Sequence, residues 1–183
     1  ETANYKSREE KPASINKILD RVAKAAYDND RAYEGCSRCV LEALQRELHL
    51  EDNEDAFRAA LKASTGLAAG VARKGETRGA LLGAIMAIGL AYGTKYLSEW
   101  EGYVKTMELA GKVFDRFKEK YGTTKCFEIQ EKLLGRHYNF WDPKDSEAWY
   151  KDGGLDACPG VCATAARIAA EVILEAQGKL KKK

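Results

Sequence analysis

The chain has 183 residues, of which 45% are hydrophobic and 32% are charged. This length and composition are typical of one folded globular domain and argue against a disordered chain. The formal net charge is only +2. Its basic excess gathers in the terminal lysines, so we expect a solvated tail and no nucleic-acid partner. The longest apolar run, from Gly79 to Gly93, is too short for a bilayer, which predicts a buried helix and no membrane span.

The first part of the chain predicts an arm followed by three helices. Residues 1–11 are polar without a period, and we expect them to form the arm. Apolar residues then recur at helical spacing in three segments that polar or glycine-containing breaks separate. The three helices are expected to start after Pro12, near Gly35 and after a cap at Asp52 or Asn53, with the first ending at residues 28–30 and the second near Leu48.

Residues 65–93 are dominated by glycine and alanine. Glycine costs a helix about 1 kcal/mol per position, so a helix that keeps several glycines predicts close approach by another backbone or a cofactor. Gly79 and Gly83 are four residues apart, which places both on one helical face. We therefore expect them at a close contact or at a cofactor. The segment around Gly70 and Gly75 follows no nucleotide-binding pattern, and close packing is the preferred interpretation there.

Two further helices are expected before residue 136. Ser98 and Glu101 form a capping box, which predicts the start of a long amphipathic helix that ends by Gly122. A shorter helix should carry Cys126 in its first turn and end at Gly135.

The last part of the chain predicts an irregular segment and a final helix. Residues 136–157 are rich in aromatic side chains, and a connection of that length is usually functional. Pro159 suits the first position of a helix, which would place Cys158 at or next to the cap. With no strand alternation, the predicted fold class is all-α. We expect a single-domain bundle of six or seven helices with a glycine-rich central helix over residues 12–178, followed by a basic tail at 179–183.

The chemistry indicated by the sequence lies in its five cysteines. An odd number cannot pair completely within one chain, so at least one thiol is free, bound to a metal or paired elsewhere. Each pair spaced three or four apart would share one helical face, and two such pairs could bind zinc or an iron-sulfur cluster. A thiolate is also favoured in the first turn of a helix, where we expect three of them. The candidate metal ligands are Cys36, Cys39, Cys126, Cys158 and Cys162.

Three short motifs make the chain resemble a known family. They are Gly35-Cys36-Ser37-Arg38-Cys39-Val40, Gly75-Glu76-Thr77-Arg78-Gly79-Ala80-Leu81-Leu82-Gly83, and Cys158-Pro159-Gly160-Val161. Together with Cys126, they are similar to the redox-active family named after its C_GCAxxG_C_C cysteine pattern. In this resemblance Cys36, Cys126 and Cys158 match the first, third and fourth cysteines of the pattern. Arg78 stands where the family usually has the second cysteine.

The resemblance implies a redox function, and we weigh two redox hypotheses and one non-redox alternative. The first is electron transfer or redox sensing through an iron-sulfur cluster, bound by Cys36, Cys39, Cys158 and Cys162 with Cys126 as substitute. Arg78 would stabilise the negative charge of thiolates or of a cluster, beside Gly79 and Gly83. The second is a thiol-disulfide enzyme that uses Cys36 or Cys158 as its redox thiol. The third is a structural zinc site in an interaction module.

The resemblance also bears on partners. Split-Soret cytochromes are similar in their helical core, which implies a dimeric, electron-transferring protein. The haem-attachment motif is missing here, so no c-type haem is expected. We expect a homodimer that serves a redox partner protein, in the cytoplasm or, if a presequence has been removed, in the periplasm.

Overall fold

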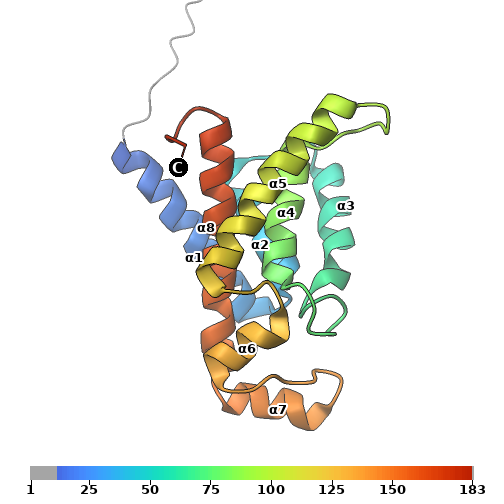
Figure 1. The fold of residues 1–183 in the computed structure, drawn as a ribbon, viewed down its shortest axis with the longest axis vertical. Coiled ribbons are helices and arrows are strands. Elements are labelled where there is room, and N and C mark those ends of the chain that lie inside the picture. The colour runs from blue at the N-terminus through green and yellow to red at the C-terminus, as the bar shows by residue number, and fades with distance from the viewer. Residues whose placement is uncertain (1–11, 183) are drawn as a thin grey trace, which may run out of the picture.

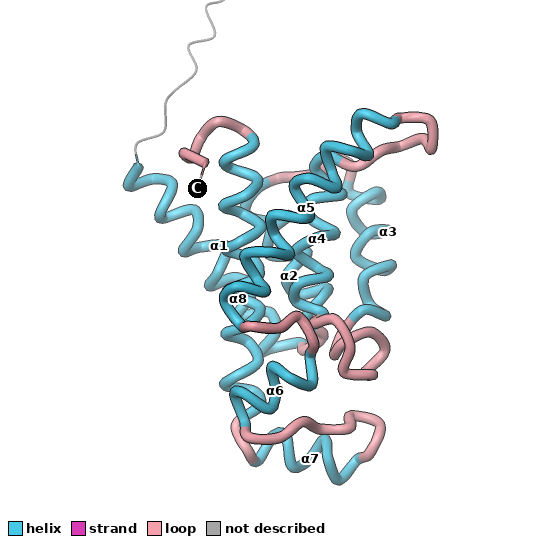
Figure 2. The backbone as a smooth tube through the Cα atoms, viewed as in Figure 1, coloured by secondary structure: helices cyan, strands magenta, loops and turns pink. Residues whose placement is uncertain are grey.

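The computed structural model describes residues 12–182 and contains, within them, helices and loops but no strand (Figures 1 and 2). The predicted all-α fold is confirmed. Its α-helices are α1 (Pro12–Tyr33), α2 (Cys36–Leu48), α3 (Glu54–Ser64), α4 (Gly79–Tyr92), α5 (Trp100–Tyr121), α6 (Cys126–Leu134), α7 (Pro143–Lys151) and α8 (Gly154–Ala176), with a short 3₁₀ turn over Thr65–Leu67. The predicted arm at residues 1–11 lies outside the described residues.

Helix α8 is the centre of the bundle and packs against α1, α2, α4 and α5 (Figure 1). Its inward face is built from small residues, and Ala165, Ala166, Ala169 and Ala170 are fully buried. Small side chains let neighbouring backbones come close, so several helices can pack on this one. Among the described helices, α8 is the one whose length and composition would allow it to cross a membrane, and 61% of its most apolar window is buried in the bundle.

The glycines of α4 face the start of α2, as the sequence predicted. A Cβ atom on Gly79 would lie 2.5 Å from the Cys36 Sγ, and one on Gly83 would overlap the carbonyl oxygen of Ser37. The Ser37 hydroxyl in turn donates to the carbonyl oxygen of Ser64 at 2.8 Å. The missing side chains therefore allow α4 to lie against α2 where Cys36 begins that helix.

Replacing Gly83 by alanine is expected to lower the free energy of unfolding by about 2 kcal/mol, because the new methyl group would collide with backbone that cannot swing away. Gly89 is the matched control, since it lies in the same helix and a Cβ there would meet no atom within 4 Å. Alanine at Gly89 should raise stability by up to about 1 kcal/mol through its higher helix propensity. Urea unfolding followed by circular dichroism measures both, and equal effects at the two positions would contradict the close packing.

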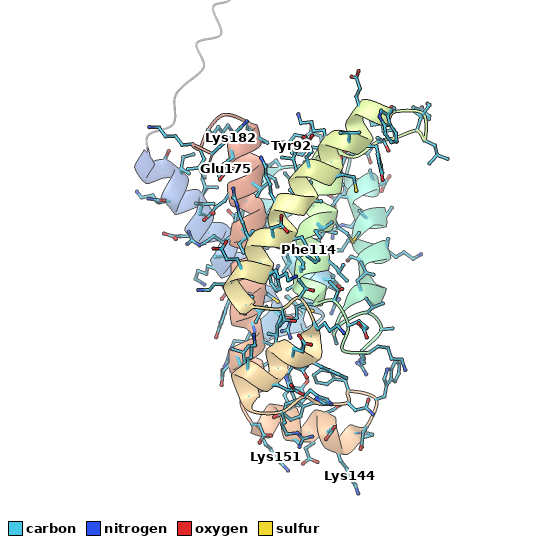
Figure 3. The ribbon with its side chains drawn as sticks, in the orientation of Figure 1. Tyr92, Phe114, Lys144, Lys151, Glu175 and Lys182 are labelled. Atoms are coloured by element: carbon cyan, nitrogen blue, oxygen red, sulfur yellow. The ribbon has the colours of Figure 1, made fainter. Side chains whose placement is uncertain are left out.

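Helices α6 and α7 form the end of the molecule opposite to the C-terminus (Figure 1). The sequence predicted an irregular segment at residues 136–157, but the middle of this segment forms helix α7. The Asp142 side chain accepts from the Lys144 amide at 2.9 Å, and Pro143 occupies the first turn, so a helix forms. Lys144 and Lys151 point away from the bundle (Figure 3), whereas Trp149 is buried.

The predicted end of α1 and the predicted cap of α5 were wrong. Helix α1 continues past residues 28–30 to Tyr33. Polar residues there find partners on other helices, as Asn29 donates to the carbonyl oxygen of Cys39 at 3.2 Å. The predicted capping box at Ser98 does not form either. Helix α5 starts at Trp100, and the Glu99 carboxylate accepts from the Lys95 amide at 2.7 Å instead.

The start of α8 also differs from the prediction. The helix begins at Gly154, so Pro159 lies inside it and Cys158 lies in its second turn rather than at its cap. Proline has no amide hydrogen, which leaves the carbonyl oxygen of Leu155 without its helical donor. The Arg31 side chain supplies a donor to that oxygen at 3.2 Å. A contact from α1 therefore allows the helix to continue through the proline.

Candidate functional site

Five free cysteines lie in the interior of the molecule, and every one of them is buried. Cys36 and Cys126 begin α2 and α6, as predicted, while Cys158 and Cys162 lie one turn apart on α8. Cys39 is the fifth. The fold thus brings thiols from three helices to the same end of the bundle.

Arg78 lies at the centre of this end and is only 2% exposed. One of its terminal nitrogens donates to the Cys126 Sγ at 3.3 Å, and its Nε has no hydrogen-bond partner within the described residues. Burial lowers the pKa of Arg78, whereas interaction with Cys158, Cys126, Cys36 and Cys162 in their ionised forms raises it, and the net direction is upward. The guanidinium therefore remains positively charged in the interior and favours thiolates around it.

The contact between Arg78 and Cys126 is fixed by backbone hydrogen bonds. The Arg78 amide donates to the carbonyl oxygen of Thr124 at 2.7 Å, and the Cys126 amide donates to that of Glu76 at 2.7 Å. An isolated bridge between Thr77 and Lys125 lies between these two bonds. The start of α6 is thereby tied to the segment that precedes α4, which holds the backbones that carry the two side chains next to each other.

A pocket of about 760 Å³ opens onto these residues. Cys36, Cys126, Cys158 and Arg78 line it, whereas Cys39 and Cys162 do not. The Cys39 thiol donates to the carbonyl oxygen of Glu34 at 3.1 Å. Part of the pocket wall comes from the aromatic-rich segment 136–157, which the sequence predicted to be functional. Its lining residues include Phe140, Trp141, Trp149 and Tyr150. The volume is in the range of small-molecule sites.

One edge of the pocket is a strained loop. Ala69, Val71, Ala72 and Arg73 all have positive φ angles, between 49° and 61°, as does Gly70 at 74°. Residues other than glycine pay about 1–2 kcal/mol each for this left-handed conformation. The indole nitrogen of Trp141 donates to the carbonyl oxygen of Ala72 at 3.1 Å and joins the loop to the aromatic wall. Such strain is typical of a functional site.

Burial dominates the protonation of the thiols. It raises the pKa of Cys36 to about 12, although positive charge on Arg78 opposes this shift. Burial also raises the pKa of Cys126, against the charge and the hydrogen bond of Arg78. The pKa of Cys162 is raised well above its usual value by burial and by the charge of Asp30. These resting thiols are neutral near pH 7, and Arg78 is the group that reduces the cost of ionising them.

This burial predicts a pH dependence of stability. Because the folded-state pKa of Cys36 is about 12 and its ordinary value is 9.0, the neutral thiol contributes stability that is fully present below pH 9. That contribution is lost as the pH rises toward 12, with a slope of up to about 1.4 kcal/mol per pH unit. Urea unfolding between pH 8 and 10.5 should show a shallower decline for Cys36→Ala than for the unmodified chain, and parallel curves would contradict the shift.

The structure also places residues that the sequence analysis did not single out. Asp30 is 7% exposed and accepts a hydrogen bond from the Cys162 thiol. Burial raises the pKa of Asp30, while the positive charge of Arg78 lowers it. Arg38 and Arg73 line the pocket as well. The only signal for Arg38 was its place between Cys36 and Cys39. Nothing in the local sequence marked Asp30.

The five candidate metal ligands share this end of the bundle. Within the part of the chain that the structure describes, no group of three or more histidine, cysteine or acidic residues is arranged to hold a metal ion. Gly79 and Gly83 face the Cys36 sulfur and the Ser37 carbonyl oxygen, so protein atoms occupy the space beside them.

The fold and the site define an all-α thiol protein in which cysteines from three helices surround a buried arginine. The profile of the family described as "Putative redox-active protein (C_GCAxxG_C_C)" matches residues 34–172. The chain therefore belongs to this redox-active family, as its motifs indicated. Searches of curated proteins and of solved structures gave no match. Arg78 lines the same pocket as Cys36, Cys126 and Cys158.

Proposed function

We propose that the protein is a thiol-disulfide redox protein in which Cys126 and Cys158 form the reacting pair. The observation that carries this proposal is the hydrogen bond from the buried Arg78 to the Cys126 Sγ, 3.3 Å long, in a pocket that Cys158 also lines. Cys158 and Cys126 are, in that order, the cysteines whose ionised forms would interact most strongly with Arg78. One guanidinium can therefore stabilise the thiolate of either residue.

The proposed reaction needs only these groups and a disulfide substrate. The thiolate of Cys126 attacks one sulfur of the substrate, whose disulfide bond breaks and releases one thiolate. The thiolate of Cys158 then attacks the mixed disulfide, forms a bond between Cys126 and Cys158 and releases the second thiolate. Two electrons pass from the two cysteines to the substrate, and the two thiol protons leave to solvent. The substrate is reduced and the protein is oxidised.

The iron-sulfur cluster and the zinc site expected from the sequence receive less support. Four sulfurs must converge within a few ångströms for either centre, and among the described residues no group of three metal-binding side chains does so. The Cys39 thiol, one of the four preferred ligands, is engaged with the Glu34 carbonyl oxygen outside the pocket. We therefore assign no step to a metal centre.

One preparation tests these functions against one another. The protein is purified without oxygen, analysed for iron, sulfide and zinc, and then oxidised with diamide before peptide mapping. We expect a colourless protein whose oxidised form links the Cys126 and Cys158 peptides. Iron with acid-labile sulfide would support the cluster instead, and zinc that persists in reductant would support the structural site. A disulfide that excludes both Cys126 and Cys158 would overturn the proposal.

A further inference from the structure

Three arginines that line the pocket lack an acidic partner. Arg38, Arg73 and Arg78 form no ion pair with any described residue. Every other described arginine forms one, and these are Arg21, Arg31, Arg46, Arg58, Arg116, Arg136 and Arg167. The unpaired positive charge of the described arginines is thus concentrated in a single cavity.

Each of these arginines is held in place by uncharged groups. Arg38 donates to the carbonyl oxygen of Tyr33 at 2.8 Å. Arg73 donates to the carbonyl oxygen of Phe140 at 3.3 Å and lies 5.4 Å from the centre of the Trp141 ring. Arg78 keeps its buried Nε without a partner. No carboxylate of a described residue lies within ion-pair distance of any of the three, which is the arrangement of an anion-binding site.

The two acidic residues that line the pocket are engaged elsewhere. The Glu34 carboxylate accepts a hydrogen bond from the Tyr150 hydroxyl. Asp30 accepts from the Cys162 thiol, and burial raises its pKa while the positive charge of Arg78 lowers it. Neither side chain forms an ion pair with a pocket arginine. A buried cation without a counter-charge is costly, so an incoming anion would gain the energy that these carboxylates do not supply.

We propose that the substrate of this thiol pair is a small anionic aromatic disulfide. Its negative group would bind between Arg78 and the arginines at the mouth, and its flat part would lie against Trp141 and Phe140. The sulfur adjacent to that ring would then reach Cys126. This inference rests on the proposed function for its disulfide chemistry. The choice of an anion rests on the arginines and the cavity alone.

The reaction is the same thiol-disulfide exchange, with an anionic aryl disulfide as the substrate. The Cys126 thiolate attacks an aryl disulfide, forming a protein-aryl mixed disulfide and releasing one aryl thiolate that carries its own anionic group. Cys158 then displaces the second aryl thiolate. The substrate gains two electrons, and a thiol reductant is needed to return the protein to its dithiol form.

Binding is tested first, without any redox step. The reduced protein is titrated with naphthalene-2-sulfonate and with uncharged naphthalene-2-sulfonamide, and binding is followed by tryptophan fluorescence, because Trp141 and Trp149 line the pocket. The sulfonate should bind at least about tenfold more tightly, because a charged hydrogen bond contributes more than about 1.4 kcal/mol. Arg78→Gln should remove this difference. Equal affinities for the two compounds in the unmodified protein would overturn the anionic assignment and leave the dithiol proposal untouched.

Reactivity is tested second, with two aromatic disulfides that differ in charge. We compare the ratio of the rate with anionic 5,5'-dithiobis(2-nitrobenzoate) to the rate with uncharged 4,4'-dithiodipyridine. This ratio should be at least about tenfold higher in the unmodified protein than in Arg78→Gln. Arg73→Gln changes a residue in an exposed stretch and should reduce the ratio even if Arg78→Gln does not fold. Arg58→Gln on α3 is the remote control and should leave it unchanged. A ratio that is unaffected at Arg73 and Arg78 would contradict the inference. Preference without a Cys126–Cys158 bond would instead contradict the proposed function.

Discussion

Replacing Arg78 by methionine is expected to increase the free energy of unfolding by about 1–3 kcal/mol while impairing redox activity. The guanidinium is 2% exposed and forms no ion pair within the described residues. A buried charge without a paired carboxylate costs stability, and an apolar residue of similar volume removes that cost. The protein would thus retain a destabilising cation because its chemistry needs it.

The same substitution at Arg116 should have the opposite effect on stability. Arg116 donates to both carboxylate oxygens of Glu175, at 3.0 and 2.8 Å, and Glu175 is 4% exposed. Arg116→Met would leave that carboxylate buried without its partner and should lower the free energy of unfolding by about 3 kcal/mol. Urea unfolding of both variants measures the contrast. If Arg78→Met is destabilised as much as Arg116→Met, Arg78 is a structural residue and its proposed role is wrong.

Replacing Cys126 by serine should slow the reduction of an aromatic disulfide by more than about 100-fold, since the hydroxyl cannot form the attacking thiolate. Cys39→Ser is the matched control, because Cys39 is also buried on the same end of the bundle but does not line the pocket. Its rate should stay within about twofold of the unmodified protein. Release of the aryl thiolate followed by absorbance gives both rates. A slow Cys39→Ser variant with a fast Cys126→Ser variant would show that Cys126 is not the attacking thiol.

Local signals in the sequence were sufficient for the elements that begin or end at glycine. Gly35 and Gly135 predicted the start of α2 and the end of α6, and both adopt left-handed conformations there. Gly79 and Gly83 predicted a close contact, which α2 makes. The cysteine at the start of each of these two helices was therefore placed correctly.

The errors arise where distant parts of the chain supply a missing partner. Pro159 predicts a helix start, but α8 passes through it, and Arg31 on α1 donates to the Leu155 oxygen that the proline leaves without a helical donor. Positive φ angles at Val71 and Ala72 have no local sequence signal at all. Likewise, an arginine without a carboxylate partner is a property of the folded chain, so the anionic character of the pocket's ligand could not be predicted. The homodimer and the cellular compartment remain predictions.

A crystal structure of the protein after oxidation would test the central claim most directly. The account predicts a bond between the sulfur atoms of Cys126 and Cys158, beside an Arg78 that remains in the pocket. It also predicts that Cys39 and Cys162 keep free thiols. Electron density that shows Cys126 and Cys158 unchanged, with the bond formed between other cysteines, would contradict the account.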